Sequence, residues 1–113
     1  MKIDAFSSCS SLINIKIPDS VIKIRKCAFY KYTALINIEI PNCVIKIDYG
    51  AFYKCSSLKD INIPNSIKII DDYAFSEFTS LTNVTIPNSV IKIGKCAFPI
   101  NYNINNVELK TNV

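Results

Sequence analysis

The sequence has no histidine and only two glycines. Without histidine, the Ser-His-Asp and Cys-His arrangements of nucleophilic enzymes are excluded, and so are histidine metal sites. Two separated glycines cannot form the glycine-rich loop that cradles a phosphate. No apolar run approaches the roughly 20 residues that a membrane-spanning helix needs, and the N-terminal segment MKIDAFSSCS lacks the apolar centre of a secretory signal. These absences predict a protein without catalysis, cofactor or membrane span.

Charged residues of both signs are present. Thirteen basic and nine acidic residues give a formal net charge of +4. This balance is too small and too mixed to make nucleic acid the expected partner. The one adjacent carboxylate pair, Asp71-Asp72, falls in a predicted turn, as does Asp48. We expect these aspartates to cap the backbone there rather than to act as acid and base.

One phrase recurs along the chain at an interval of 23 residues. The pair Ala-Phe marks it and occurs at Ala5-Phe6, Ala28-Phe29, Ala51-Phe52, Ala74-Phe75 and Ala97-Phe98. Columns of leucine, of paired β-branched residues and of proline follow in step. We therefore expect a single domain over 1–113. It should contain four full units, starting at Ala5, Ala28, Ala51 and Ala74, and a polar, truncated fifth unit from Ala97.

A unit of this size is too small to bury its own apolar face, so the units should stack into a repeat solenoid. The segment LTNVTIP alternates apolar and polar residues, which predicts a short strand. Copies of it would form a parallel sheet with neighbouring strands about 4.8 Å apart, and proline would end each strand. The VIKI segments predict a second, shorter extended stretch. Apolar residues three apart between Phe52 and Leu58 predict one turn of helix or 3₁₀ helix.

The cysteines are Cys9, Cys27, Cys43, Cys55 and Cys96. Cys9 and Cys55 share a predicted core column two turns apart, about 10 Å, whereas a disulfide needs Cα atoms within about 7 Å. The same distance argument excludes a bond between Cys27 and Cys96. Disulfides between different columns stay open, but an odd count without C-x-x-C spacing predicts neither a metal site nor a disulfide framework. We interpret Cys9, Cys55 and Cys96 as small apolar filler.

The segments LTNVTIPNSVIKIGKCAF and AFYKCSSLKDINIPNSI resemble the BspA-like class of leucine-rich repeats, and the resemblance covers the whole chain. It implies a right-handed superhelix with a parallel β-sheet on the concave side. Modules of this class occur in surface and secreted proteins of anaerobic bacteria and parasitic protists, where they are associated with adhesion. Related arrays occur as intracellular interaction proteins.

The resemblance therefore implies a non-catalytic protein-binding module for adhesion or host and cell-surface interaction, as part of a longer surface or secreted protein. A cytosolic scaffold for protein–protein interaction is the alternative, and a purely structural array segment is a third possibility. The two ends bear on this choice. The first unit lacks a preceding strand and is expected to expose Phe6 and Leu12, which favours a fragment over a complete protein that dimerises through this face. The asparagine-rich last unit is expected to act as a C-terminal cap.

Candidate partner-binding residues are those that point outward from the predicted concave strands. They form two columns, here called the strand-face columns, with Asn14, Asn37, Asp60 and Asn83 beside Lys16, Glu39, Asn62 and Thr85. The amides either hydrogen-bond to one another between turns or form a polar recognition surface. Mixed charge in the second column favours a protein partner. It argues against nucleic acid as the partner, since binding of a phosphate backbone requires positive charge.

A second candidate surface, here called the association strip, consists of Ile22, Lys23, Ile45, Lys46, Ile91 and Lys92. These side chains are expected to face outward, and their order is reversed at Lys68-Ile69. Three interpretations stay open: β-propensity with codon usage, self-association, or a ligand surface. A smaller aromatic-basic patch at Tyr30-Lys31 and Tyr53-Lys54 keeps nucleic-acid or membrane binding as a minor alternative.

Overall fold

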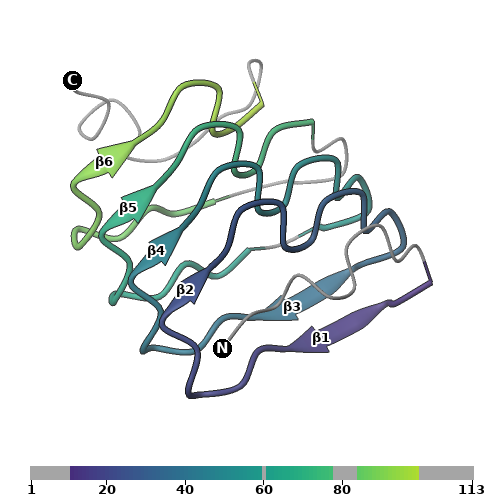
Figure 1. The fold of residues 1–113 in the computed structure, drawn as a ribbon, viewed down its shortest axis with the longest axis horizontal. Coiled ribbons are helices and arrows are strands. Elements are labelled where there is room, and N and C mark those ends of the chain that lie inside the picture. The colour runs from purple at the N-terminus through teal and green to yellow at the C-terminus, as the bar shows by residue number, and fades with distance from the viewer. Residues whose placement is uncertain (1–10, 60, 78–83, 100–113) are drawn as a thin grey trace.

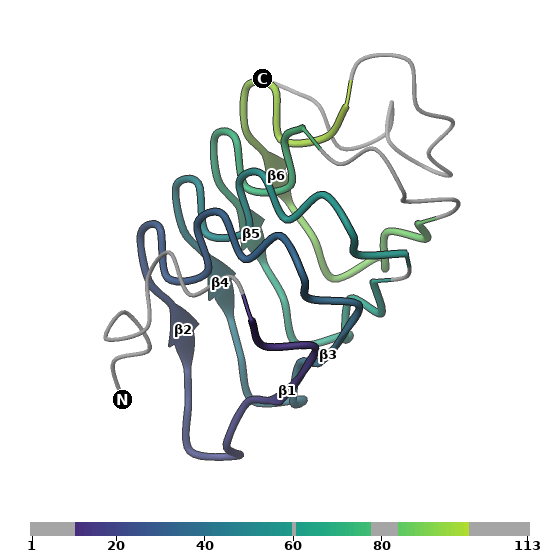
Figure 2. The same ribbon diagram turned by 90° about the vertical axis from the view of Figure 1, so that its right-hand side faces the viewer.

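Two parallel sheets run along the molecule in a computed structural model that describes residues 11–59, 61–77 and 84–99 (Figure 1). In the first, β1 (Asn14–Lys16) pairs with β3 (Asn37–Glu39). The second contains β2 (Lys23–Ile24), β4 (Lys46–Ile47), β5 (Ile69–Ile70) and β6 (Lys92–Ile93). The chain contributes one strand to the second sheet in each described coil, and Figure 2 shows successive coils lying side by side. The expected repeat solenoid is therefore confirmed.

The register of both sheets follows the repeat. Asn14 pairs with Asn37, and Ile24 pairs with Ile47, each 23 residues further on. Pairing of identical columns is what buries each apolar residue against its own copy in the next coil. Residues 61–63 and 84–86 keep the buried–exposed–buried alternation of the first sheet, although no multi-residue strand is assigned to them. The VIKI segments form strands of two residues, against three in the first sheet, as expected for the shorter extended stretch. Their sheet nevertheless has more strands in the described part of the chain.

The predicted helical or 3₁₀ turns need correction, because the described residues contain no helix. Single hydrogen-bonded turns take their place, as when Ala28 N donates to Arg25 O at 3.0 Å. The reason lies in the backbone: Cys27 and Lys31 have φ of 55° and 62°, in the left-handed region. A residue in that region interrupts a right-handed helix after one turn. The freed amides bond to the next coil instead, as Phe29 N does to Ala51 O at 2.8 Å.

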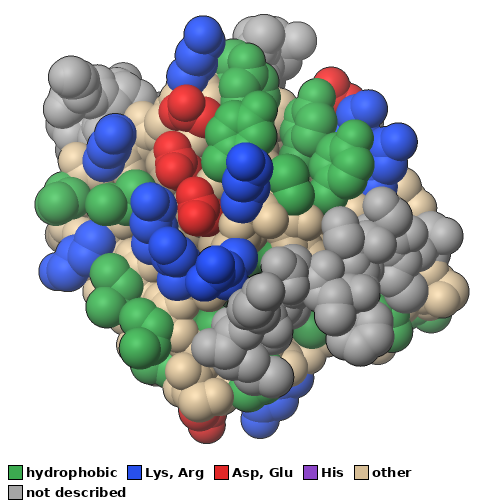
Figure 3. All heavy atoms as spheres, in the orientation of Figure 1, with side chains coloured by type: hydrophobic (Ala, Val, Ile, Leu, Met, Phe, Trp, Pro, Cys, Tyr) green, Lys and Arg blue, Asp and Glu red, His purple; other side chains and the backbone are tan. Residues whose placement is uncertain are grey.

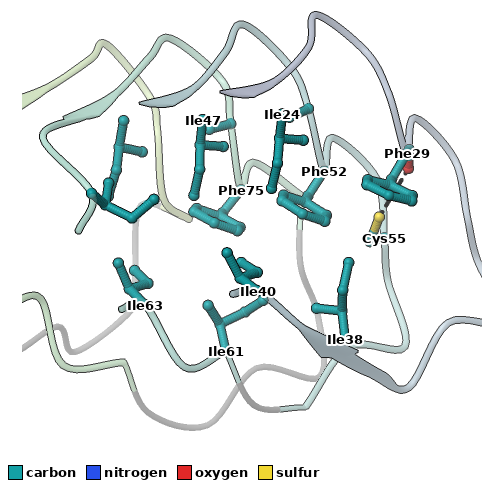
Figure 4. Packing of buried hydrophobic residues seen from close by; sticks show 14 of the residues in the cluster. Ile24, Phe29, Ile38, Ile40, Ile47, Phe52, Cys55, Ile61, Ile63 and Phe75 are labelled. Atoms are coloured by element: carbon teal, nitrogen blue, oxygen red, sulfur yellow. Dashed lines mark hydrogen bonds between the residues drawn. The ribbon is translucent and has the colours of Figure 1, made fainter. Parts of the chain in front are cut away.

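A continuous apolar core fills the space between the two sheets and the turns (Figure 4). Its most regular feature is a stack of four phenylalanine rings, Phe29, Phe52, Phe75 and Phe98, whose neighbouring centroids are 5.2, 5.2 and 5.3 Å apart. No charged or polar residue is buried in the described segments. Leu35 and Leu58 are fully buried, whereas Leu12 in the same column is exposed, as the sequence predicted. The predictions for Phe6 and the asparagine-rich last unit concern residues outside the described ranges.

Candidate functional site

The strand-face columns lie on the β1-β3 sheet. The Asn37 side-chain amide donates to Asn14 Oδ1 at 3.0 Å, so the predicted contact between amides of successive turns is present. In the second column Lys16 is the register partner of Glu39, and both side chains are exposed. Asn62 and Thr85 are exposed further along the same column. Asp60 and Asn83 lie outside the described residues.

A shallow depression lies over this sheet. Its lining consists of Asn14, Ile15, Lys16, Asn37, Ile38 and Glu39. These side chains offer amide, ammonium and carboxylate groups but no nucleophile paired with a base, so the surface is suited to binding rather than to chemistry. Sequence reasoning missed the apolar part of this surface. Ile13 and Ile36 precede the two strands and are 51% and 36% exposed. Their column continues with Lys59, so it does not stand out as an apolar column in the repeat alignment.

The association strip lies along β2, β4, β5 and β6. Ile22, Ile45 and Ile91 are 58%, 46% and 69% exposed, so these three face solvent as predicted. Two of the three lysines form ion pairs. Lys23 Nζ lies 3.9 Å from Asp48 Oδ2, and Lys46 Nζ lies 3.8 Å from Asp71 Oδ2. Lys23 and Lys46 therefore each have an ion-pair partner in the next coil, which sequence reasoning did not foresee. On the face seen in Figure 3, a row of acidic side chains lies between basic side chains, and exposed apolar side chains form clusters beside them.

The aspartates act as predicted. Asp48 Oδ1 accepts the amide of Tyr49 at 2.8 Å, and Asp71 Oδ1 accepts the amide of Asp72 at 2.8 Å. Asp72 Oδ1 in turn accepts the Lys95 amide of the following coil at 2.9 Å. Each carboxylate of the adjacent pair thus serves the backbone, and none is aimed at its neighbour as an acid-base dyad would be.

The cysteines divide according to position. Cys55 is fully buried and its thiol donates to Phe29 O at 3.0 Å, in agreement with a filler role. Burial raises the pKa of the Cys55 thiol to about 12, which makes it a poor nucleophile. The filler interpretation is wrong for Cys96, which is exposed, whereas Cys27 in the same column, also on left-handed backbone, is half-buried. Cys9 lies outside the described residues. Within the described ranges, no cluster of residues could hold a metal ion.

The aromatic-basic patch is larger than predicted. It comprises Tyr30, Lys31, Tyr49, Tyr53, Lys54, Tyr73 and Glu77, here called the Tyr-Lys patch. Neighbouring ring centroids are 5.7 Å apart for Tyr30 and Tyr53, 6.1 Å for Tyr53 and Tyr73, and 5.8 Å for Tyr49 and Tyr73. The contributions of Tyr49 and Tyr73 were not foreseen, because they occupy different repeat columns and meet only across coils.

The charged groups of the Tyr-Lys patch are held by its rings. Lys31 Nζ lies 5.5 Å from the Tyr30 centroid, and Lys54 Nζ lies 5.6 Å from that of Tyr53. The Tyr53 hydroxyl donates to Glu77 Oε2 at 3.3 Å. Partial burial, with repulsion from the Glu77 carboxylate, raises the pKa of Tyr53, so its hydroxyl remains a donor well into the alkaline range.

Comparison with known proteins identifies the repeat. A family model described as "BspA type Leucine rich repeat region (6 copies)" matches residues 1–113. The chain belongs to the BspA-type leucine-rich repeat family. Repeats of this family generally serve protein interaction and are generally non-catalytic. None of the curated proteins matched the chain significantly.

Two solved structures of leucine-rich repeat proteins are similar over most of the chain. A leucine-rich repeat protein of T. pallidum is 40% identical with a TM-score of 0.80, over 88% of this chain and 46% of that one. A leucine-rich repeat protein from Bacteroides ovatus is 36% identical with a TM-score of 0.77, over 83% of this chain and 24% of that one. The present chain thus spans less than half the length of either. In the described residues, no helix is long and apolar enough to cross a bilayer.

Proposed function

We propose that this BspA-type repeat chain is a protein-binding module that contacts its partner through the strand-face columns and the isoleucines beside them. The observation that carries the proposal is the composition of that surface. Exposed Ile13 and Ile36 directly precede Asn14 and Asn37, at the start of the two strands. At the end of the same strands, Lys16 and Glu39 place opposite charges side by side. Apolar contact area beside polar groups of both signs is typical of protein–protein interfaces and unlike a phosphate-binding surface.

The finer proposal is adhesion, with the module forming part of a longer surface or secreted protein. It is supported by the family resemblance, and a cytosolic scaffold remains the alternative use of the same surface. We also propose that the chain is divided into four full units and a truncated fifth. Binding of the purified chain to a panel of purified extracellular matrix proteins, measured by biolayer interferometry, tests the adhesion proposal. Adhesion predicts saturable binding to at least one of them, and its absence for all would favour the scaffold.

A paired substitution tests the surface itself. Ile13→Ser with Ile36→Ser should weaken binding by at least tenfold, because burial of one such side chain at an interface contributes about 1.5–3 kcal/mol. Ile22→Ser with Ile45→Ser is the matched control, since it removes two exposed isoleucines from the other sheet. Equal loss of binding in the two variants, or no loss in the first, would reject the strand-face columns as the contact surface.

A further inference from the structure

The Tyr-Lys patch contains three side chains that the fold does not require. Lys31, Lys54 and Glu77 occupy the same repeat column in successive coils, and each has a left-handed backbone, with φ of 62°, 66° and 61°. Glycine adopts this conformation without strain, whereas a residue with a Cβ does so at a cost. Cys27, Tyr73 and Cys96 also stand on left-handed backbone, so this column is distinguished by the charge that each of its three members carries.

The side chains of this column are organised as a site. A depression at the turns is lined by Lys31, Thr33, Lys54, Ser56 and Glu77. Both ammonium groups rest over tyrosine rings of their own coil, and Glu77 accepts the hydroxyl of Tyr53. Side chains that are held in place lose less rotamer entropy when a ligand binds, which favours recognition. Tyrosine supplies rigid contact area and is enriched in interfaces.

The order of charges selects the kind of ligand. Along the solenoid the column is positive, positive and negative, at intervals of about 4.8 Å. A uniform polyanion bound to Lys31 and Lys54 would extend to Glu77, whose carboxylate would repel it. The ring faces of Tyr30 and Tyr53 are taken up by each other and by the ammonium groups, which leaves little free surface on which a nucleic-acid base could stack. Both features disfavour nucleic acid and favour a polypeptide that carries both charges.

The spacing specifies the peptide further. The point midway between Lys31 and Lys54 lies one and a half coils from Glu77, or about 7 Å. In an extended peptide, side chains two residues apart point to the same side and are separated by about 6.7 Å. We propose that the Tyr-Lys patch is a second docking site, which binds an extended segment of a partner protein with the pattern acidic-x-basic. The acidic side chain lies between the two lysines, and the basic one lies beside Glu77.

The probe for this site is the synthetic peptide acetyl-Ser-Glu-Ser-Arg-Ser-amide, titrated into the isotope-labelled chain and followed by amide chemical shifts. The shifts should cluster at residues 30–33, 53–56 and 76–77. Acetyl-Ser-Glu-Ser-Glu-Ser-amide should bind more weakly because its second carboxylate meets Glu77. A decathymidine oligonucleotide that binds at the same residues more tightly than the first peptide would overturn the proposal.

Three variants separate binding from folding. Lys31→Gly with Lys54→Gly should weaken binding of the first peptide about tenfold, since each exposed ion pair contributes up to about fivefold. The melting temperature should rise in this variant because backbone strain is relieved. Glu77→Gly should also raise the melting temperature. This variant should bind the Glu-x-Glu peptide more tightly than the unmodified chain does. Lys59→Gln with Lys68→Gln removes the same net charge elsewhere and should leave binding unchanged. Unaltered peptide binding in the double glycine variant, or a lower melting temperature in both glycine variants, contradicts the proposal.

Discussion

The stacked phenylalanines allow a quantitative test of what holds the coils together. Phe52 is fully buried and stacks on two rings, Phe29 and Phe75, each at 5.2 Å and nearly parallel. Phe98 stacks on only one described ring, Phe75, at 5.3 Å. An aromatic pair contributes about 0.5–1.5 kcal/mol beyond the area that it buries. Phe52→Leu preserves most of the apolar volume but loses two pairs, so it should cost about 2 kcal/mol, against about 1 kcal/mol for Phe98→Leu.

The measurement is urea unfolding followed by circular dichroism, with m-values compared to confirm that unfolding stays two-state, since repeat arrays can lose cooperativity. A double-mutant cycle isolates the ring contact: Phe52→Leu with Phe75→Leu should show a coupling energy of about 0.5–1.5 kcal/mol. Phe29→Leu with Phe98→Leu is the control, since these rings are three coils apart. Their effects on the free energy of unfolding should be additive. Equal costs at Phe52 and Phe98, together with zero coupling between Phe52 and Phe75, would refute the argument that ring stacking links the coils.

Three further outcomes follow from the geometry. Gly94→Ala should cost about 1–3 kcal/mol in chemical unfolding, because the new Cβ would lie 2.4 Å from Asp72 N and must displace backbone; wild-type stability would show that this contact yields freely. The raised pKa of Cys55, about 12 against an ordinary 9.0, stabilises the fold below pH 9, and that contribution is lost as pH rises from 9 to 12, at up to about 1.4 kcal/mol per pH unit. Cys55→Ala should decline less steeply over this range, and parallel pH curves would contradict the assignment. Replacement of the strip isoleucines Ile22, Ile45 and Ile91 by threonine should lower the sedimentation coefficient at high concentration if the strip mediates self-association, and an unchanged value would exclude it.

Much of the fold could be predicted because each core column repeats at a constant interval. Phe29, Phe52 and Phe75 stack because they are equivalent residues of successive coils, and no knowledge of long-range contacts was needed to place them together. The outward direction of Ile22 and Ile91 followed in the same way, from their positions between two core residues.

The parts that could not be predicted involve contacts between different columns. Tyr49 and Tyr73 meet although they hold different repeat positions, and Lys23 reaches Asp48 in the next coil. Aligned repeats show which residues share a column, but not which neighbouring columns the turns bring within reach. The apolar rim at Ile13 and Ile36 was missed for a related reason, since its column changes to lysine in the third unit.

The sequence by itself determined that this chain is a solenoid of BspA-type repeats, since a 23-residue period of apolar columns has one stable solution, which is stacking. Only the tertiary structure decided which sheet has more strands and that the turns are not helical. It also decided that Lys31, Lys54 and Glu77 stand on left-handed backbone. The physical reason is that the repeating apolar residues predict which positions are buried. The φ angle at a turn depends instead on the hydrogen bonds that its amides make to the adjacent coil. Those bonds bring the tyrosines and charged residues of the Tyr-Lys patch into contact across successive coils.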